Sequence, residues 1–172
     1  AELDDLDVTR RAGELTAREA LAMGINWVYA PVADLDLEPA NPIVGSRAFG
    51  KDPERAARHV TAWIEGCRQG GALSCAKHFP GHGRTTSDSH LGLPTVDVDE
   101  AALETDLLPF RAAIDAGVDA MMTAHVAYPA LDPTGVPATL SRPILTGLLR
   151  ERLGFDGLIV TDALNMKGVQ GG

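Results

Sequence analysis

Chemically active side chains are densest in the stretch KHFPGHG at 77–83 and in the Asp88-Ser89-His90 that follows it. The glycines and the proline interrupt regular structure, and loops of this kind are where binding and catalytic side chains concentrate. We therefore expect a functional loop here. The alternative is that these side chains only hydrogen-bond within the loop, and His82 is the first candidate for such a structural role.

Asp88 and His90 are two residues apart, and in an extended loop alternate side chains point the same way. A carboxylate beside an imidazole fixes the tautomer of the ring and favours its protonated form. A histidine held in this way can donate and then accept a proton near neutral pH. The pair is therefore a candidate general acid/base, and the alternative is an ordinary surface Asp–His pair.

Asp162 directly follows the apolar stretch at 158–161. A carboxylate at the end of a buried strand is costly to desolvate unless cations and hydrogen-bond donors meet it, and Arg47 and Lys77 are available cations. An ionised, desolvated aspartate that faces a pocket can attack the anomeric carbon of a sugar. The alternative is an aspartate that only caps the following helix.

A metal centre is another possible use of the histidines. His78 and His82 are four residues apart, but a proline and a glycine between them prevent the helix that would put both on one face. Proton transfer and covalent attack need no metal and no other cofactor, so none is expected. A metal-dependent hydrolase would need a wider ligand set, which in this sequence is His78, His90, His125 and Asp162.

The elements that position these groups repeat along the chain. Short apolar strands alternate with amphipathic helices, and this pattern implies an α/β fold of parallel strands with right-handed crossovers. A doubly wound sheet and a (β/α)8 TIM barrel share the pattern, but no glycine-rich phosphate loop follows the first strand. Polar residues follow every strand instead, as on the upper face of a barrel. The expected strands are 26–31, 72–76, 120–123 and 158–161, followed by Asp34 and Asp36, by Lys77-His78, by His125 and by Asp162, respectively.

The helices have clear start signals. Asp52 and Pro53 are a cap and a first helical residue, Asp99 caps the next helix, and Ser141 caps the last one. Pro109 predicts a kink or a late start of the helix that contains it. The helix before the first strand is expected to bury one apolar face, made of Ala12, Leu15, Ala22 and Met23.

Four strands are half of a closed barrel, which takes eight strands and about 250 residues. Residues 1–172 are therefore expected to form part of a TIM-barrel domain that is truncated at both ends. By itself such a piece exposes two sheet edges, so we expect it to associate and to show little or no turnover. The oligomeric state of the complete protein is left open.

The composition is that of a folded globular chain with an acidic balance. Apolar residues make up 45% and charged residues 23%, and the net charge of −9 argues against nucleic acid or an anionic membrane surface as a partner. No apolar run approaches the roughly 20 residues of a membrane helix, so membrane insertion is not expected. Cys67 and Cys75 match neither a disulfide framework nor a redox motif and are expected in the core. For the compartment, the cytoplasm is the first expectation and export is the alternative.

Four motifs occur in this order: Ser46-Arg47-Ala48-Phe49, then 77–83 with 88–90, then Ala124-His125, and finally 154–157 with 161–166. Together they resemble the catalytic barrel of glycoside hydrolase family 3, over roughly residues 20–168. More narrowly, they are similar to the bacterial β-N-acetylglucosaminidases of peptidoglycan recycling. The β-glucosidase branch usually lacks the Asp-Ser-His tripeptide and takes its acid/base from a later domain, so the tripeptide favours the glucosaminidase branch.

The resemblance implies a retaining hydrolase that releases terminal β-linked N-acetylglucosamine from peptidoglycan-derived or chitin-derived glycans. It implies that Asp162 forms a covalent glycosyl-enzyme and that His90 is the acid/base, with Asp88 behind it. The loop that carries His90 is rich in small and polar residues, so we expect it to be mobile and to close over substrate. Without substrate, His90 is expected to lie away from Asp162.

The resemblance also implies that Arg47, Lys77 and His78 bind the hydroxyls and the acetamido side of the sugar, with His125 near the same subsite. Two alternatives within the family are an N-acetylglucosaminide phosphorylase and a β-glucosidase. A third alternative is a sugar-binding module without catalysis, which would keep the two cations but would not need Asp162.

Overall fold

Four parallel strands form one open sheet in the order β1-β2-β3-β4 in this computed structural model, which describes residues 3–170. The α/β class with parallel strands is confirmed. The first two and last two residues of the expected domain, 1–172, lie outside the described residues. The strands are β1 (Trp27–Val28), β2 (Leu73–Phe79), β3 (Ala120–Thr123) and β4 (Leu158–Thr161).

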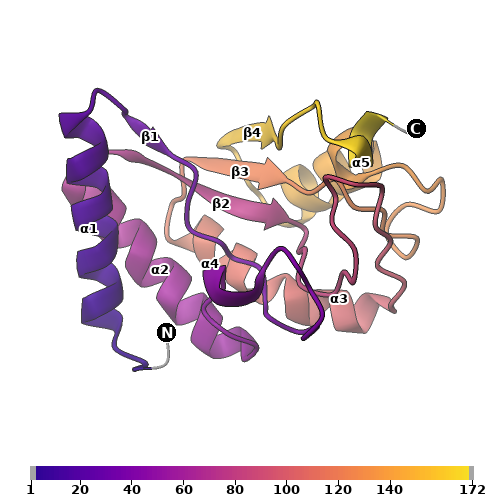
Figure 1. Cartoon of the computed structure of the whole chain (residues 1–172), viewed down its shortest axis with the longest axis horizontal. Coiled ribbons are helices and arrows are strands. Elements are labelled where there is room, and N and C mark those ends of the chain that lie inside the picture. The colour runs from indigo at the N-terminus through magenta and orange to yellow at the C-terminus, as the bar shows by residue number, and fades with distance from the viewer. Residues whose placement is uncertain (1–2, 171–172) are drawn as a thin grey trace.

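Helices connect the strands, and α2, α4 and α3 run along one side of the sheet (Figure 1). Helix α1 packs against α2 beside β1. The helices are α1 (Leu6–Ala22), α2 (Pro53–Gly70), α3 (Glu100–Asp106), α4 (Leu108–Asp115) and the short α5 (Lys167–Gln170), with two 3-10 turns, η1 (Gly45–Arg47) and η2 (Ala138–Leu140), and a π-helical segment, η3 (Pro143–Arg152).

The predicted helix signals are confirmed. The Asp52 carboxylate accepts a hydrogen bond from Arg55 N at 2.7 Å, and the Asp99 carboxylate caps α3 in the same way. Ser141 Oγ accepts a hydrogen bond from Ile144 N at 3.2 Å at the start of η3. The helix that contains Pro109 is interrupted, as predicted, because α3 ends at Asp106 and α4 begins at Leu108.

The strand prediction was right for β3 and β4 and wrong in length for the other two. β1 has only two paired residues, so most of 26–31 runs as extended chain outside a strand. β2 continues to Phe79, because the backbone of Lys77 pairs with Met122 on one side and with Val32 on the other. Lys77 and His78 therefore belong to a strand rather than to a loop.

The expected buried face of α1 was also wrong. Leu15 is 42% exposed and Met23 is 79% exposed, whereas Thr9, Gly13 and Ala17 face the protein. The reason is a close helix contact made by small residues of both helices. A Cβ atom added at Gly66 of α2 would lie 1.9 Å from the carbonyl oxygen of Arg10, so the two backbones nearly touch. This contact turns the apolar stripe of α1 outward.

The main core lies between the sheet and the helices that cover it. Phe79 and Phe110 pack edge to face with ring centroids 5.5 Å apart, next to the fully buried Met121. Cys67 and Cys75 are free and buried, as expected, and burial raises the pKa of these thiols to about 11 and about 12. No helix within residues 3–170 is both long enough and apolar enough to cross a membrane.

The close contact between α1 and α2 makes a testable prediction. We expect Gly66→Ala to destabilise the protein at its full natural length by about 1–3 kcal/mol, because the added methyl group meets the α1 backbone. The matched control is Gly147→Ala in η3, where nothing lies within 4 Å of the added atom and a neutral or slightly stabilising effect is expected. Thermal unfolding checks both variants. Equal melting temperatures for Gly66→Ala and the unmodified protein would contradict the packing described here.

Candidate active site

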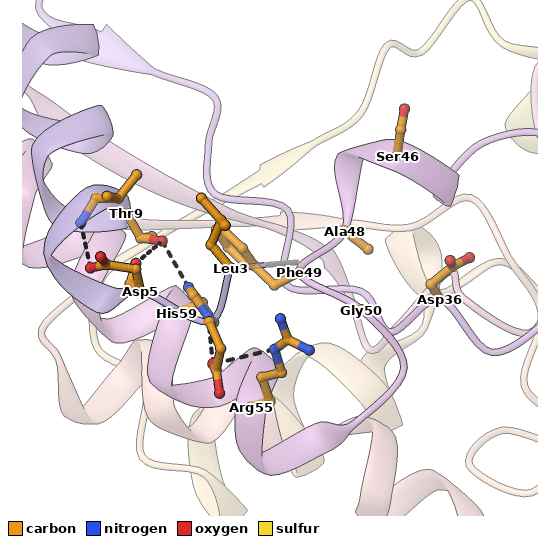
Figure 2. Close-up of a pocket in the computed structure, with 12 residues that line it drawn as sticks. Leu3, Asp5, Thr9, Asp36, Ser46, Ala48, Phe49, Gly50, Arg55 and His59 are labelled. Atoms are coloured by element: carbon orange, nitrogen blue, oxygen red, sulfur yellow. Dashed lines mark hydrogen bonds and ion pairs between the residues drawn. The ribbon is translucent and has the colours of Figure 1, made fainter. Parts of the chain in front are cut away.

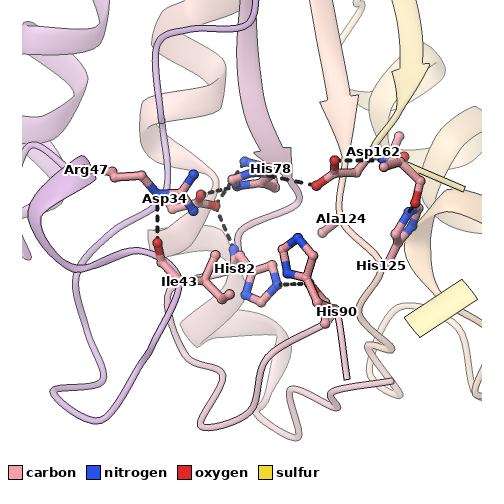
Figure 3. Close-up of polar contacts among 12 residues, drawn as sticks. Asp34, Ile43, Arg47, His78, His82, His90, Ala124, His125 and Asp162 are labelled. Carbon is pink, nitrogen blue, oxygen red and sulfur yellow. Dashed lines mark hydrogen bonds and ion pairs between the residues drawn. The ribbon is translucent and has the colours of Figure 1, made fainter. Parts of the chain in front are cut away.

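The predicted site residues gather where the strands end. Lys77 and His78 lie at the end of β2, His125 follows β3, and Asp162 follows β4. Figure 3 shows Asp34, His78 and Asp162 in a row across the ends of the strands. The pairing of β2 with β3 shifts at this point, between Lys77 and Phe79, and the Lys77–His78 peptide bond is cis.

Asp34 is the buried anchor of this row. One carboxylate oxygen accepts hydrogen bonds from His78 N at 3.1 Å and from His82 N at 2.7 Å. The other accepts one from His78 Nδ1 at 2.7 Å. Because an ionised carboxylate can only accept, the Nδ1 of His78 carries a proton. The opposite ring nitrogen, Nε2, then faces Asp162 Oδ2 at 3.9 Å.

Two effects act on the pKa of Asp34. Burial on its own raises the pKa, but the His78 ring and the hydrogen bonds from both histidines outweigh it and hold the pKa below its usual range. Asp34 is therefore a fully buried, ionised group. From the sequence, Asp34 was only one of several polar residues predicted to follow a strand. Its position after the first strand was the only sequence signal that pointed to the site.

Asp162 is half-buried, with 28% of its side chain exposed. Its Oδ1 accepts a hydrogen bond from Ala163 N at 2.8 Å. No helix begins at Asp162, since α5 starts at Lys167, so the aspartate is not a helix cap. Within the described residues, His78 is the only basic side chain within ion-pair distance of this carboxylate.

The two expected cations lie near each other without an ion pair to Asp162 in the described part of the chain. Lys77 is half-buried. Its burial, and then the nearby positive charge of Arg47, lower the pKa of its amine, and the negative charges of Asp162 and Asp34 partly oppose this shift. Arg47 stands on η1 with an exposed side chain, and its Nε donates a hydrogen bond to the carbonyl oxygen of Ile43 at 2.8 Å.

Asp88 and His90 are in contact, as their spacing suggests. Asp88 Oδ1 accepts hydrogen bonds from His90 N at 2.8 Å and from His90 Nδ1 at 2.6 Å. The backbone hydrogen bond, and then the side-chain one, lower the pKa of the Asp88 carboxyl. His90 is 61% exposed, and no hydrogen bond or ion pair joins it to Asp162 in the described structure. The catalytic role of the pair stays a prediction.

His125 is buried and bonded to the protein through both ring nitrogens. Nδ1 lies 2.7 Å from Thr139 Oγ1, and Nε2 lies 3.1 Å from the carbonyl oxygen of Ala163. Since a carbonyl only accepts, Nε2 carries a proton. His125 thus supports the backbone immediately after Asp162, and its contact with substrate stays a prediction.

Two hollows lie near these residues. One, of about 480 Å3, lies beside Lys77 and Arg47 and is otherwise mostly apolar. A larger one, of about 590 Å3, lies between the start of α1 and α2, where Thr9 and Asp4 hold the buried ring of His59 (Figure 2). Neither hollow includes Asp162, so the candidate site is placed at the strand ends by the contacts of its side chains and not by a hollow.

The alternative metal site is not assembled. In residues 3–170 the side chains of His78, His90, His125 and Asp162 do not come together as a set of metal ligands, and neither does any other group of three or more such residues.

The Glycosyl hydrolase family 3 N terminal domain matches residues 1–171 of the sequence. The chain belongs to glycoside hydrolase family 3. It is 44% identical over 167 residues to a β-hexosaminidase of Chromobacterium violaceum, a match that covers 96% of this chain and 46% of the relative. The resemblance inferred from the motifs is therefore confirmed.

Solved structures of the family superpose closely. A β-N-acetylglucosaminidase from Paenibacillus sp. str. FPU-7 matches with a TM-score of 0.95 and 44% identity, over 97% of this chain and 32% of that one. A β-glucoside phosphorylase bound to 2FGlc matches with a TM-score of 0.92 and 36% identity, over 96% of this chain and 31% of that one. The four-stranded sheet is thus part of a TIM-barrel-like fold, and the chain spans less than half the length of these relatives.

The buried Asp34 carboxylate makes a second prediction. We expect Asp34→Ala to destabilise the protein by about 3–5 kcal/mol, because it leaves the His78 ring and two backbone N–H groups without their buried acceptor. Asp36→Ala is the matched control, since Asp36 is only half-buried and forms no side-chain hydrogen bond in the described structure; less than about 0.5 kcal/mol is expected.

The effect should depend on pH in a defined direction. A carboxyl whose pKa is lower when folded stabilises the protein above its unfolded pKa of about 3.9 and loses that contribution as pH falls through the folded pKa. The difference in melting temperature between wild type and Asp34→Ala is therefore full above about pH 5 and shrinks below about pH 4. A difference that grows on acidification would contradict this assignment.

Proposed function

We propose that the protein at its full natural length is a retaining β-N-acetylhexosaminidase that releases terminal non-reducing β-linked N-acetylglucosamine. The observation that carries the proposal is the position of the Asp162 carboxylate. It lies directly after β4 and faces the buried pair of His78 and Asp34, and the chain also carries the exposed pair of His90 and Asp88. Relatives named β-hexosaminidase and β-N-acetylglucosaminidase support the choice of sugar. Peptidoglycan-derived and chitin-derived glycans are the proposed natural substrates.

Asp162 is the nucleophile in this proposal. Its carboxylate receives one hydrogen bond from its own chain, so lone pairs remain for attack on the anomeric carbon. Attack forms an ester between Asp162 and the sugar and expels the leaving group, and water later hydrolyses the ester. Lys77 and Arg47 add positive charge near the reacting carboxylate.

His90 is the proposed acid/base, and Asp88 is its orienting partner. The Nδ1–H of His90 donates to Asp88, so the opposite nitrogen, Nε2, is left to give a proton to the departing oxygen and later to take one from water. The exposed position of the ring requires the loop to close before the reaction, as many enzyme loops do.

Substrate binding is assigned to side chains around the nucleophile. Arg47 and Lys77 are hydrogen-bond donors for the sugar hydroxyls and the acetamido oxygen, and the Nε2 of His78 faces the same space. We assign His125 to the vicinity of the same subsite, and its hydrogen bond to the backbone of Ala163, next to Asp162, supports this assignment.

A phosphorylase is the second candidate, because one close structural neighbour is a β-glucoside phosphorylase. Two like unit charges about 4 Å apart repel by about 4 kcal/mol at an effective dielectric near 20. A histidine acid/base, unlike the usual second carboxylate, does not add this repulsion against an incoming phosphate. The proposed catalytic pair is compatible with both water and phosphate as acceptors.

The nucleophile assignment makes a third prediction. Asp162→Ala should lower kcat by about 1,000-fold or more on aryl N-acetylglucosaminides, because no covalent intermediate forms. Asp156→Ala, at an exposed position two residues before the same strand, is the control and should keep normal turnover. A 2-fluoro or 5-fluoro sugar should label Asp162, as located by mass spectrometry of peptides. A label on another side chain, or normal turnover by Asp162→Ala, would contradict the assignment.

Phosphate separates the two candidate reactions in a fourth prediction. For a hydrolase, the rate and the product, free N-acetylglucosamine, should be the same with and without phosphate. Mass spectrometry identifies the released sugar, and phosphorus NMR detects any sugar 1-phosphate. Formation of a sugar 1-phosphate that rises with phosphate concentration would replace the hydrolase proposal with the phosphorylase one.

A further inference from the structure

We propose that His82 is a positioning residue, which holds Ser89 with its buried ring and thereby sets the place of Asp88 and His90 in the reaction. This inference rests on the proposed acid/base role of the Asp88–His90 pair. It adds a function to a histidine for which the sequence predicts only a structural role within its own loop.

The His82 ring joins two parts of the same loop. It is almost fully buried, with Nδ1 2.7 Å from Thr85 Oγ1 and Nε2 3.0 Å from Ser89 Oγ. Its backbone N–H donates to Asp34, the same carboxylate that orients His78. Figure 3 draws the His82 ring in the same close-up as His78 and His90.

The neighbouring hydrogen bonds decide the tautomer of this ring. The side-chain oxygen of Asn41 accepts from two backbone N–H groups, so its amide nitrogen is the atom that donates to Thr85 Oγ1 at 3.2 Å. The Thr85 hydroxyl donates its one proton to the carbonyl oxygen of His82 at 3.1 Å. Thr85 Oγ1 therefore accepts from His82 Nδ1–H, and the free lone pair of Nε2 accepts the hydroxyl proton of Ser89.

A neutral ring fits this arrangement. Burial lowers the pKa of His82, and the Asp34 charge opposes this shift only in part. The ring therefore keeps one proton near neutral pH, as the hydrogen-bond pattern requires.

Ser89 is also fixed from the side of the nucleophile. Its carbonyl oxygen accepts a hydrogen bond from Gly168 N at 2.9 Å, in the segment that follows Asp162. A Cβ atom at Gly168 would lie 2.8 Å from that oxygen, so only glycine allows this approach. Ser89 is buried, whereas both of its neighbours, Asp88 and His90, are partly or largely exposed. Hydrogen bonds thus fix Ser89, the middle residue of the 88–90 tripeptide, while Asp88 and His90 on either side of it face outward.

Two substitutions at His82 separate the two hydrogen bonds. In His82→Asn the side-chain amide takes the place of Nδ1 and reaches Thr85 but not Ser89. In His82→Gln the amide takes the place of Nε2 and reaches Ser89. Ser89→Ala removes the other partner, and Ser87→Ala, at an exposed position of the same loop, is the matched control.

We expect His82→Asn and Ser89→Ala to lower kcat/KM, which reports formation of the glycosyl-enzyme, by about 10-fold or more on substrates with poor leaving groups, because these need a placed general acid. The kcat/KM values on activated aryl substrates should change much less. The double variant should be no worse than either single one, because both remove the same contact. His82→Gln should recover most of the rate, and Ser87→Ala should behave as the unmodified protein.

Amide hydrogen exchange gives a readout that does not depend on glycosidase activity. His82→Asn and Ser89→Ala should each speed exchange in residues 85–92, and Ser87→Ala should not. A protein that hydrolyses no hexosaminide but shows this pattern would refute the proposed function and keep the His82–Ser89 anchor. Unchanged exchange, additive losses in the double variant, or equal losses on good and poor leaving groups would overturn the positioning role. Ser89→Ala preserves the test if the His82 variants fail to fold.

Discussion

One buried carboxylate organises the ends of the strands. Asp34 has no access to water and is held ionised by the hydrogen bonds that it receives from the two histidines. Burial of an ionised carboxylate is unfavourable unless hydrogen-bond donors replace the lost water. The backbone of β2 and of the following turn must therefore fold around Asp34 to supply these donors. The positions of His78 and His82 follow from this requirement.

The two halves of the proposed catalytic machinery meet at this anchor. On one side, Asp34 fixes the His78 ring, whose Nε2 faces Asp162. On the other side, it holds the backbone of His82, whose ring reaches Ser89 between the members of the exposed pair. A displacement of the anchor would therefore shift the surroundings of both the proposed nucleophile and the proposed acid/base, although neither contacts Asp34 directly.

Local signals predicted much of this structure, and non-local packing accounts for what they missed. The caps at Asp52 and Asp99 and the bounds of β3 and β4 depend on neighbouring residues and were predicted correctly. The outward stripe of α1 was missed because a backbone contact through Gly66, far away in sequence, decides which face is buried. The importance of Asp34 was missed because burial of a carboxylate depends on partners that only the fold brings together.

The placement of Lys77 and His78 within β2, and of His90 on an exposed loop, divides the site by stiffness. The part proposed to meet the sugar ring is built on hydrogen-bonded sheet, where a change of one residue disturbs the core. The part proposed to meet the departing group lies on a loop whose exposed positions, Thr86, Ser87 and His90, surround the buried Ser89. With these proposed roles, replacement of exposed loop residues other than His90 changes the group that is cleaved off more readily than the sugar that is recognised.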